Sequence, residues 1–143
     1  MLRNIDPILS PDLLHVLRAM GHGDEIVIAD ANFPGESLGQ RCIRADGLTA
    51  TDVFSAVLSV MPLDTFVESP LHAMAVVGDP SSIPDVVQAF QKIVNVVADH
   101  PAPITRIERF DFYGRAKAAF AVVQTGERRL YGNIIIKKGV IPL

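Results

Sequence analysis

The chain has 143 residues, a formal net charge of −3 and hydrophobic residues at 49% of its positions. A chain of this size is typical of one domain, so we expect residues 1–143 to form a single domain with a well-buried core. The small acidic charge without a basic tract argues against nucleic-acid binding, and apolar runs too short to span a bilayer argue against a membrane protein.

The cysteine content and the first residues of the chain exclude further classes. Cys42 is the only cysteine, which rules out an intramolecular disulfide and a zinc site built on several thiolates; we expect a small buried thiol. His15, His72 and His100 lack metal-ligand spacing and are interpreted as structural or solvated, so no metal is expected. Residues 1–12 carry acids and prolines instead of the apolar stretch of a signal peptide, which favours a cytoplasmic protein. The high apolar fraction predicts a homo-oligomer.

The first third of the chain has clear helix and strand signals. Ser10 is a predicted N-cap, and leucines at helical spacing continue the helix to Met20. Gly21 is expected to end this helix in a left-handed conformation. Residues 25–29 are apolar and rich in β-branched side chains, which predicts a strand buried on both faces. Residues 31–39 are expected to form a loop because of their proline and glycines.

The remaining chain continues this alternation of helices and strands, which predicts the α/β class with a central sheet flanked by helices on both faces. In order, the expected elements are a helix capped by Thr49 or Thr51 and stopped by Pro62, a strand over 71–77, a helix capped by Ser82 and ending near His100, a strand over 104–110, a helix over 111–119, and strands over 120–126 and 133–141. Ligands of such sheets collect beyond the carboxyl ends of the strands, which directs attention to Asp30, Arg109 and Asp111.

His22 lies between two glycines, just before the first predicted strand. The glycines allow unusual backbone angles and the close approach of a ligand. Histidine gains and loses a proton near neutral pH, so His22 can act as acid and as base. Asp24 either holds the ring or caps a turn. The alternative is an ordinary solvated side chain in a turn.

Three other positions also allow a structural or a functional interpretation. Asp30 either forms a turn or accepts hydrogen bonds from ligand hydroxyls. Arg109 alternates with Arg106 on the strand predicted over 104–110, so one of the two is expected to face solvent, and a guanidinium suits an oxygen-rich ligand. Residues 130–133 (LYGN) form either a β-turn with a packed aromatic ring or a pocket whose tyrosine hydroxyl and asparagine amide bind a polyhydroxylated molecule.

Four segments carry a specific combination of motifs: residues 10–34, which include GHGDEIVIADANFP, residues 43–48 (IRADGL), residues 106–128 (RIERFDFYGRAKAAFAVVQTGER) and residues 131–140 (YGNIIIKKGV). Together they resemble the RbsD/FucU family of sugar mutarotases, and within it the L-fucose mutarotase branch. The resemblance spans essentially the whole chain.

The resemblance implies an α/β protein that interconverts the anomers of a free monosaccharide, L-fucose in this branch, without a cofactor. It implies that His22 is the proton donor and that the subunits assemble into a homo-oligomer, a ring-shaped decamer. The sugar-binding residues that it implies are Asp30, Arg109, Tyr131, Gly132 and Asn133.

Two positions bear on the identity of the sugar. The ribose-pyranase branch typically has a histidine where Arg109 stands, so Arg109 favours fucose. Asn32 stands where the fucose branch often has a histidine, so the substrate preference is expected to differ slightly. The alternatives are a ribose-pyranase type or other monosaccharide mutarotase, and a sugar-binding module without catalysis.

Anomer exchange needs an acid and a base, because the ring C1–O5 bond opens when O5 gains a proton and the C1 hydroxyl loses one. We expect His22 to protonate O5 and Tyr131 to be the second acid–base group. The predicted strand separates His22 from Asp30. Both residues therefore reach one sugar only if the loop folds back or a neighbouring subunit supplies one of them.

Overall fold

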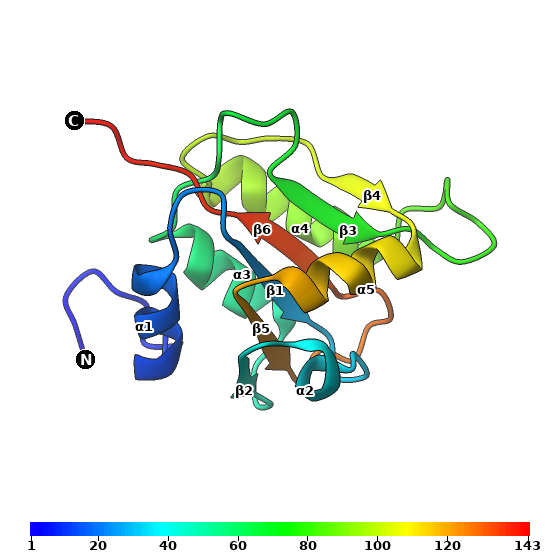
Figure 1. Cartoon of the computed structure of the whole chain (residues 1–143), viewed down its shortest axis with the longest axis horizontal. Coiled ribbons are helices and arrows are strands. Elements are labelled where there is room, and N and C mark those ends of the chain that lie inside the picture. Colours follow the sequence, from blue (N-terminus) through cyan, green and yellow to red (C-terminus); the bar gives the residue numbers. More distant parts are fainter.

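The computed structural model describes all residues from 1 to 143. A six-stranded sheet forms the middle layer and helices cover both of its faces, which confirms the predicted α/β class (Figure 1). None of the helices is both long and apolar enough to cross a membrane. In chain order the elements are α1 (Pro11–Ala19), β1 (Glu25–Ala29), α2 (Gly35–Leu38), β2 (Cys42–Ala45), α3 (Ala50–Leu58), β3 (Leu71–Met74), α4 (Asp85–Val97), β4 (Thr105–Ile107), α5 (Arg109–Ala118), β5 (Ala121–Thr125) and β6 (Ile134–Lys137).

The strand order explains why one end of the sheet collects loops from the whole chain. The order is β2-β5-β1-β6-β3-β4. β1 pairs in parallel with β5, β5 with β2 and β3 with β4, whereas β6 runs antiparallel to both β1 and β3. All strands except β6 therefore point the same way. As a result, the start of β6 meets the carboxyl ends of β1, β3 and β4 at one end of the sheet.

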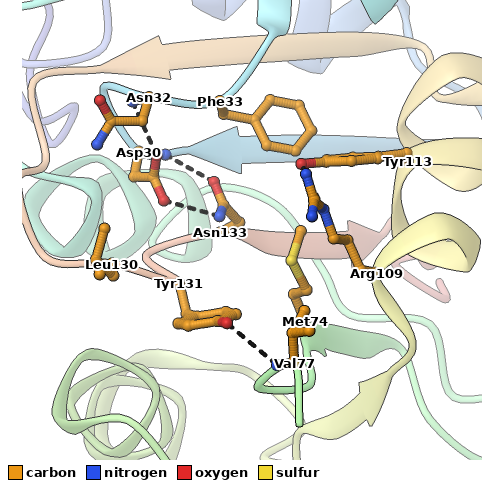
Figure 2. A pocket seen from close by; sticks show the side chains of 10 residues that line it. All are labelled: Asp30, Asn32, Phe33, Met74, Val77, Arg109, Tyr113, Leu130, Tyr131 and Asn133. Carbon is orange, nitrogen blue, oxygen red and sulfur yellow. Dashed lines mark hydrogen bonds between the residues drawn. The ribbon is translucent and has the colours of Figure 1, made fainter.

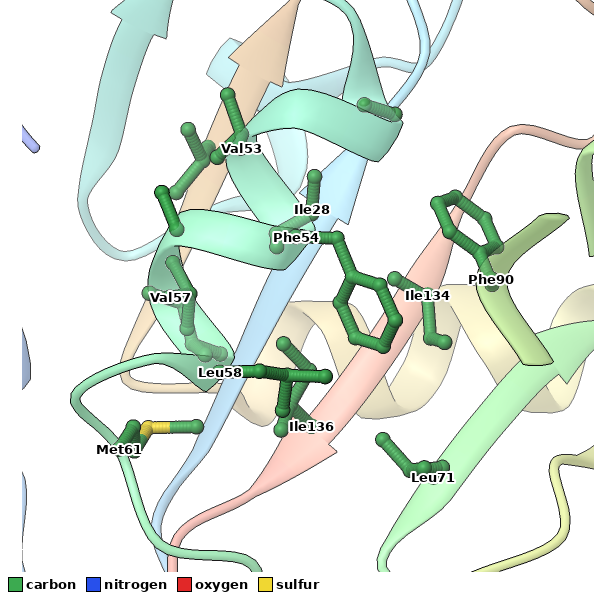
Figure 3. Close-up of a cluster of buried hydrophobic side chains, with 14 of the residues drawn as sticks. Ile28, Val53, Phe54, Val57, Leu58, Met61, Leu71, Phe90, Ile134 and Ile136 are labelled. Carbon is green, nitrogen blue, oxygen red and sulfur yellow. The ribbon is translucent and has the colours of Figure 1, made fainter. Parts of the chain in front are cut away.

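Alternate residues of β1 point to opposite faces of the sheet and take part in two cores. Ile26 and Ile28 belong to the larger core, which packs against α1, α3 and α4. There the rings of Phe54 and Phe90 meet edge to face with centroids 5.1 Å apart (Figure 3). Val27 belongs to the smaller core, which packs against α5. Burying a large apolar side chain contributes about 1.5–3 kcal/mol, so both layers of helices anchor this strand.

Two short elements were not expected from the sequence. The segment 31–39, predicted as a loop, contains the single-turn helix α2, and the edge strand β2 follows it. No residue of β2 is buried, because the strand lies at the edge of the sheet. Its sequence, CIRA, also lacks the strict alternation of apolar and polar residues that marks a half-buried strand. Cys42 at its start is half-buried rather than buried, and burial raises the pKa of its thiol.

The end of α1 differs from the prediction in its capping. The helix ends at Ala19, and Gly21 does not adopt the left-handed conformation, which occurs instead at Gly23 with φ 84°. The Lys138 Nζ satisfies the last carbonyls by donating to Leu17 O at 2.7 Å and to Met20 O at 2.6 Å. A cation at a helix C-terminus also interacts favourably with the helix dipole, so this helix end needs no glycine cap.

The helices of the larger core begin at or near the predicted caps. Thr49 caps α3 as predicted, because its hydroxyl accepts the Asp52 N–H at 3.2 Å. α4 begins after Pro84 rather than after Ser82. Proline disfavours a helical conformation for the residue before it, so Ile83 cannot be part of the helix.

The strand predicted over 104–110 is wrong in its second half. β4 ends at Ile107, and the Glu108 carboxylate caps α5 by accepting the N–H groups of Phe110 at 2.8 Å and Asp111 at 3.2 Å. Arg109 is therefore the first residue of a helix and not a strand residue that alternates with Arg106.

Candidate functional site

A cavity of about 210 Å³ opens at the end of the sheet where β1, β3 and β4 finish and β6 begins (Figure 2). Its walls come from the loop after β1, the loop after β3, the first turn of α5 and the loop before β6. The topology therefore brings together residues from four separate parts of the chain. The lining residues are Asp30, Asn32, Phe33, Met74, Val77, Arg109, Tyr113, Leu130, Tyr131 and Asn133.

Asp30 and Asn133 form the buried polar wall of this cavity. The Asn133 side chain binds Asp30 twice, because its Oδ1 accepts the Asp30 N–H at 2.8 Å and its Nδ2 donates to Asp30 Oδ2 at 2.9 Å. The Asn32 N–H donates to Asp30 Oδ1 at 2.9 Å. Burial raises the pKa of Asp30 above 3.8, although the hydrogen bonds from Asn32 and Asn133 oppose the rise. Carboxylate oxygens accept more than one hydrogen bond each, so Asp30 can still bind ligand hydroxyls.

Arg109 forms a second polar wall from the first turn of α5. Its Nε donates to the Tyr113 hydroxyl at 3.2 Å. Its guanidinium lies 5.7 Å from the Phe110 ring centroid and 5.3 Å from that of Tyr113. These contacts hold the side chain beside the cavity, while its terminal nitrogens have no acceptor within the chain (Figure 2). Such free donors suit a ligand rich in oxygen atoms.

The segment before β6 has a constrained backbone. Tyr131 adopts a left-handed conformation with φ 63°, which is uncommon for a residue other than glycine. Its phenol oxygen accepts the Val77 N–H at 3.1 Å (Figure 2). Gly132 does not line the cavity. A Cβ at Gly132 would lie only 2.7 Å from Glu127 Cγ, so a larger residue would displace this segment.

The cavity contains most of the residues that the sequence analysis connects with sugar, together with others that it missed. Asp111 is exposed and does not line the cavity. Met74 is the last residue of β3, whereas the sequence predicts a strand that runs on to residue 77. Because ligands collect beyond the carboxyl ends of strands, the correct end of β3 would have directed attention to Met74. Tyr113 lies one turn after Arg109, but this is visible only when Arg109 is placed on a helix. The sugar-binding candidates that line the cavity are Asp30, Arg109, Tyr131 and Asn133.

His22 lies at the opposite end of β1 from this cavity. β1 has five residues, which at about 3.3 Å each span roughly 16 Å. The His22 side chain is 44% exposed, and its ring centroid lies 5.1 Å from that of Phe66. Asp24 does not hold the ring, because its Oδ2 accepts the Gly21 N–H at 2.8 Å and closes the turn. Within one chain, His22 and Asp30 therefore do not share a site.

The buried carboxylate of Asp64 orients the His22 ring and was not indicated by the sequence. Asp64 Oδ1 lies 3.1 Å from His22 Nε2 and also accepts the Phe66 N–H at 3.0 Å. Burial alone would raise the pKa of Asp64, but the hydrogen bonds from Phe66 and His22 outweigh it, and the pKa falls below 3.8. An ionised carboxylate only accepts, so Nε2 carries a hydrogen, and Nδ1 has no hydrogen-bond partner within the chain.

Comparisons with known proteins place this geometry in a family. A family model described as the RbsD / FucU transport protein family matches residues 3–141. The fucose mutarotase of Streptococcus pneumoniae, solved in complex with L-fucose, is 44% identical, with a TM-score of 0.91 over 99% of this chain and 100% of that chain. Protein Atu2016, to which sugar binding is attributed, is 44% identical, with a TM-score of 0.94 over 99% and 97%. FucU from Bifidobacterium longum is 38% identical, with a TM-score of 0.91 over 98% and 100%. The chain belongs to the RbsD/FucU family.

Proposed function

We propose that the protein is a mutarotase of free monosaccharides and that its substrate is L-fucose. The observation that carries the proposal is the placement of Asp30, Arg109, Tyr131 and Asn133 around one small cavity. Sugar hydroxyls both donate and accept hydrogen bonds, and these side chains offer a carboxylate acceptor, guanidinium donors and two groups that do both. The 44% identity to a fucose mutarotase that was solved with L-fucose supports the choice of sugar.

The proposed reaction needs two proton transfers. O5 gains a proton and the C1 hydroxyl loses one, so that the C1–O5 bond breaks and a carbonyl forms at C1. Rotation about the C1–C2 bond and closure on the other face return both protons and give the other anomer. His22 gives the proton to O5, and the Tyr131 phenol oxygen takes the proton of the C1 hydroxyl while its own phenolic proton passes to solvent; closure of the ring reverses these transfers. Each such positioned group contributes about 10²–10⁴-fold to the rate.

His22 reaches the sugar from a neighbouring subunit in this proposal. Exposed apolar side chains flank both halves of the site, with Phe66 (73% exposed) beside His22 and Val77 and Leu130 (61% and 68% exposed) on the rim of the cavity. These patches belong to opposite ends of the sheet, so their contact is head to tail, an arrangement that forms a ring when the rotation between subunits closes. We propose a ring-shaped homo-oligomer, a decamer, whose sites lie between adjacent subunits.

The central test measures the exchange of L-fucose anomers by saturation-transfer NMR. His22→Ala should slow the exchange by about 100-fold or more, because it removes the proposed proton donor. His15→Ala is the matched control: His15 is exposed on α1, and its replacement should leave the rate unchanged. The proposal fails if His22→Ala exchanges the anomers as fast as the unaltered protein.

A mixing experiment tests whether two subunits share the site. His22→Ala subunits lack the donor, and Asp30→Asn subunits lack the sugar-binding carboxylate, so each variant alone should be inactive. In randomly mixed rings, about a quarter of the sites pair an intact cavity with an intact His22, and about a quarter of the activity should return. No recovery in rings shown to be mixed by mass spectrometry would place both groups in one subunit.

Two alternatives remain for the same cavity. A ribose-pyranase type of activity predicts faster exchange with ribose than with L-fucose when both are measured under identical conditions. A sugar-binding module without catalysis, favoured by the 44% identity to Atu2016, predicts binding but no exchange at any pH. A mutarotase that uses His22 instead predicts exchange of the anomers by the unaltered protein and its loss in His22→Ala.

A further inference from the structure

The phenol of Tyr131 is held by a loop from a different part of the chain. We define the β3–α4 loop as residues 75–84. Its Val77 N–H donates to the Tyr131 phenol oxygen at 3.1 Å. A phenol oxygen that accepts this bond directs its own O–H elsewhere, and the cavity lies beside it (Figure 2). The position of Val77 therefore sets the direction in which the Tyr131 phenol exchanges a proton with a ligand.

The β3–α4 loop has few contacts that fix its own shape. Val77 and the following residues up to Ser81 are exposed. Within the loop, the Asp79 N–H donates to Val76 O at 3.2 Å and the Ser82 N–H to Asp79 O at 3.1 Å. Gly78 is left-handed with φ 79° and has no neighbour within 4 Å of the position that a Cβ would take. The Ser81 hydroxyl donates to Asp79 Oδ1 at 3.1 Å, and at the start of the loop the Ala75 N–H donates to Ile107 O at 2.8 Å. Within one subunit, none of these bonds ties the exposed residues 77–81 to the rest of the fold.

Arg106 on β4 supplies the stronger attachment. Its Nη1 donates to Pro80 O at 2.8 Å and to Ser82 O at 2.6 Å. Hydrogen bonds from a charged guanidinium are shorter and stronger than those between neutral groups. The Arg106 side chain is half-buried and does not line the cavity, so it cannot itself bind the ligand.

We propose that Arg106 is a positioning residue for the reaction. By fixing the β3–α4 loop, Arg106 holds the Val77 N–H where it orients the Tyr131 phenol toward the sugar. The inference rests on the proposed function in that Tyr131 is the acid–base group at C1. The proposal goes beyond that function by adding Arg106, which lies outside the cavity and affects the proton transfer at C1 only through Tyr131.

The first test compares Arg106→Gln with Arg106→Lys in anomer exchange at several sugar concentrations. Arg106→Gln should lower kcat by about tenfold to a hundredfold and change KM much less, because the loop no longer orients Tyr131 while Asp30 and Arg109 still bind sugar. Arg106→Lys keeps a cationic donor near the two carbonyls and should recover part of kcat. Arg128→Gln, at an exposed arginine that does not line the cavity, is the control and should match the unaltered protein. An unchanged kcat in Arg106→Gln overturns the proposal.

The second test is a double-mutant cycle with Tyr131→Phe, which lacks the phenol oxygen that Val77 binds. If Arg106 acts through Tyr131, then Arg106→Gln should lower kcat no further in the Tyr131→Phe background. If the two losses multiply, Arg106 acts independently of Tyr131 and the proposal is wrong.

The third test does not depend on activity. Hydrogen exchange of the Val77 amide should become faster by about tenfold or more in both Arg106→Gln and Tyr131→Phe, while the amide of the buried Ile135 keeps its protection. Unchanged exchange at Val77 in Arg106→Gln overturns the positioning role. If the unaltered protein exchanges no sugar anomers but Val77 responds as expected, the proposed function fails while the attachment of the loop stands.

Discussion

The carboxylate of Glu127 lies buried behind the segment that carries Tyr131. Its Oε1 accepts the Arg129 N–H and Nε–H, both at 2.9 Å, and its Oε2 accepts Arg129 Nη2 at 2.7 Å. Arg129 also donates to the Thr51 hydroxyl at 3.2 Å, at the start of α3. The Glu127 carbonyl accepts the N–H of Ala31, directly after Asp30. Glu127 thus joins the loop before β6 to both α3 and the loop after β1.

The protonation of Glu127 should make stability depend on pH. The hydrogen bonds from the Arg129 side chain are the main reason why the pKa of Glu127 falls from 4.5 to about 2. Glu127 therefore stabilises the fold above the unfolded pKa, and this contribution is lost as the pH falls from about 4.5 through about 2. The whole shift corresponds to about 3 kcal/mol, but the Arg129 side chain is 44% exposed, so we expect about 1–2 kcal/mol.

Urea unfolding of the unaltered protein and of Glu127→Gln measures this contribution. The difference in the free energy of unfolding should be largest near about pH 6 and should shrink steadily toward about pH 2.5. A difference that stays the same over this range would mean that Glu127 acts through packing and not through its charge.

At the scale of elements, the sequence predicts those helices and strands that their own residues stabilise. Ser10 marks the start of α1, and the apolar run of β1 predicts a strand that is buried on both faces. β2 is different, because it is a strand only through its pairing with the distant β5, where Cys42 lies opposite Val122. The helical start at Arg109 depends on the Glu108 cap, which the continuing alternation of apolar residues conceals.

Gly114 weakens α5 in the middle of the helix. It is exposed, and no atom lies within 4 Å of the position that a Cβ would take. Alanine is favoured over glycine in helix interiors by about 0.5–1 kcal/mol. Gly114→Ala should therefore raise the free energy of unfolding by about this amount in urea denaturation, with the slope unchanged. A destabilised variant would indicate that another chain packs closely against this side of α5.

At the scale of the whole molecule, the residues of the cavity are more predictable than their relation to His22. The rule on strand ends and the family resemblance both lead to Asp30 and Arg109, because the parallel strands deliver both to one end of the sheet. No local pattern relates His22 to Asp64, which lies 42 residues further along the chain. The completion of a site by another subunit depends on surfaces, which a single sequence does not describe.

The proposed ring predicts that Phe66 stabilises the contact between subunits. Phe66→Asp places a charge in this apolar contact, so sedimentation velocity should show smaller species and anomer exchange per subunit should fall. Circular dichroism should stay the same, because Phe66 is exposed within its own chain. Val96→Asp is the matched control on α4, where Val96 is 85% exposed, and it should change neither property. Normal assembly and exchange in Phe66→Asp would exclude this face from the interface.

The position of β1 in the sheet has a consequence for how the chain folds during synthesis. β1 is made early, but both of its neighbours, β5 and β6, belong to the last part of the chain. A nascent chain that has not yet emerged to Thr125 cannot pair either edge of β1, and the second edge stays unpaired until Lys137 has emerged. The centre of the sheet therefore forms only after β5 and β6 have left the ribosome, and until then Ile26, Val27 and Ile28, which are fully buried in the folded protein, are open to aggregation.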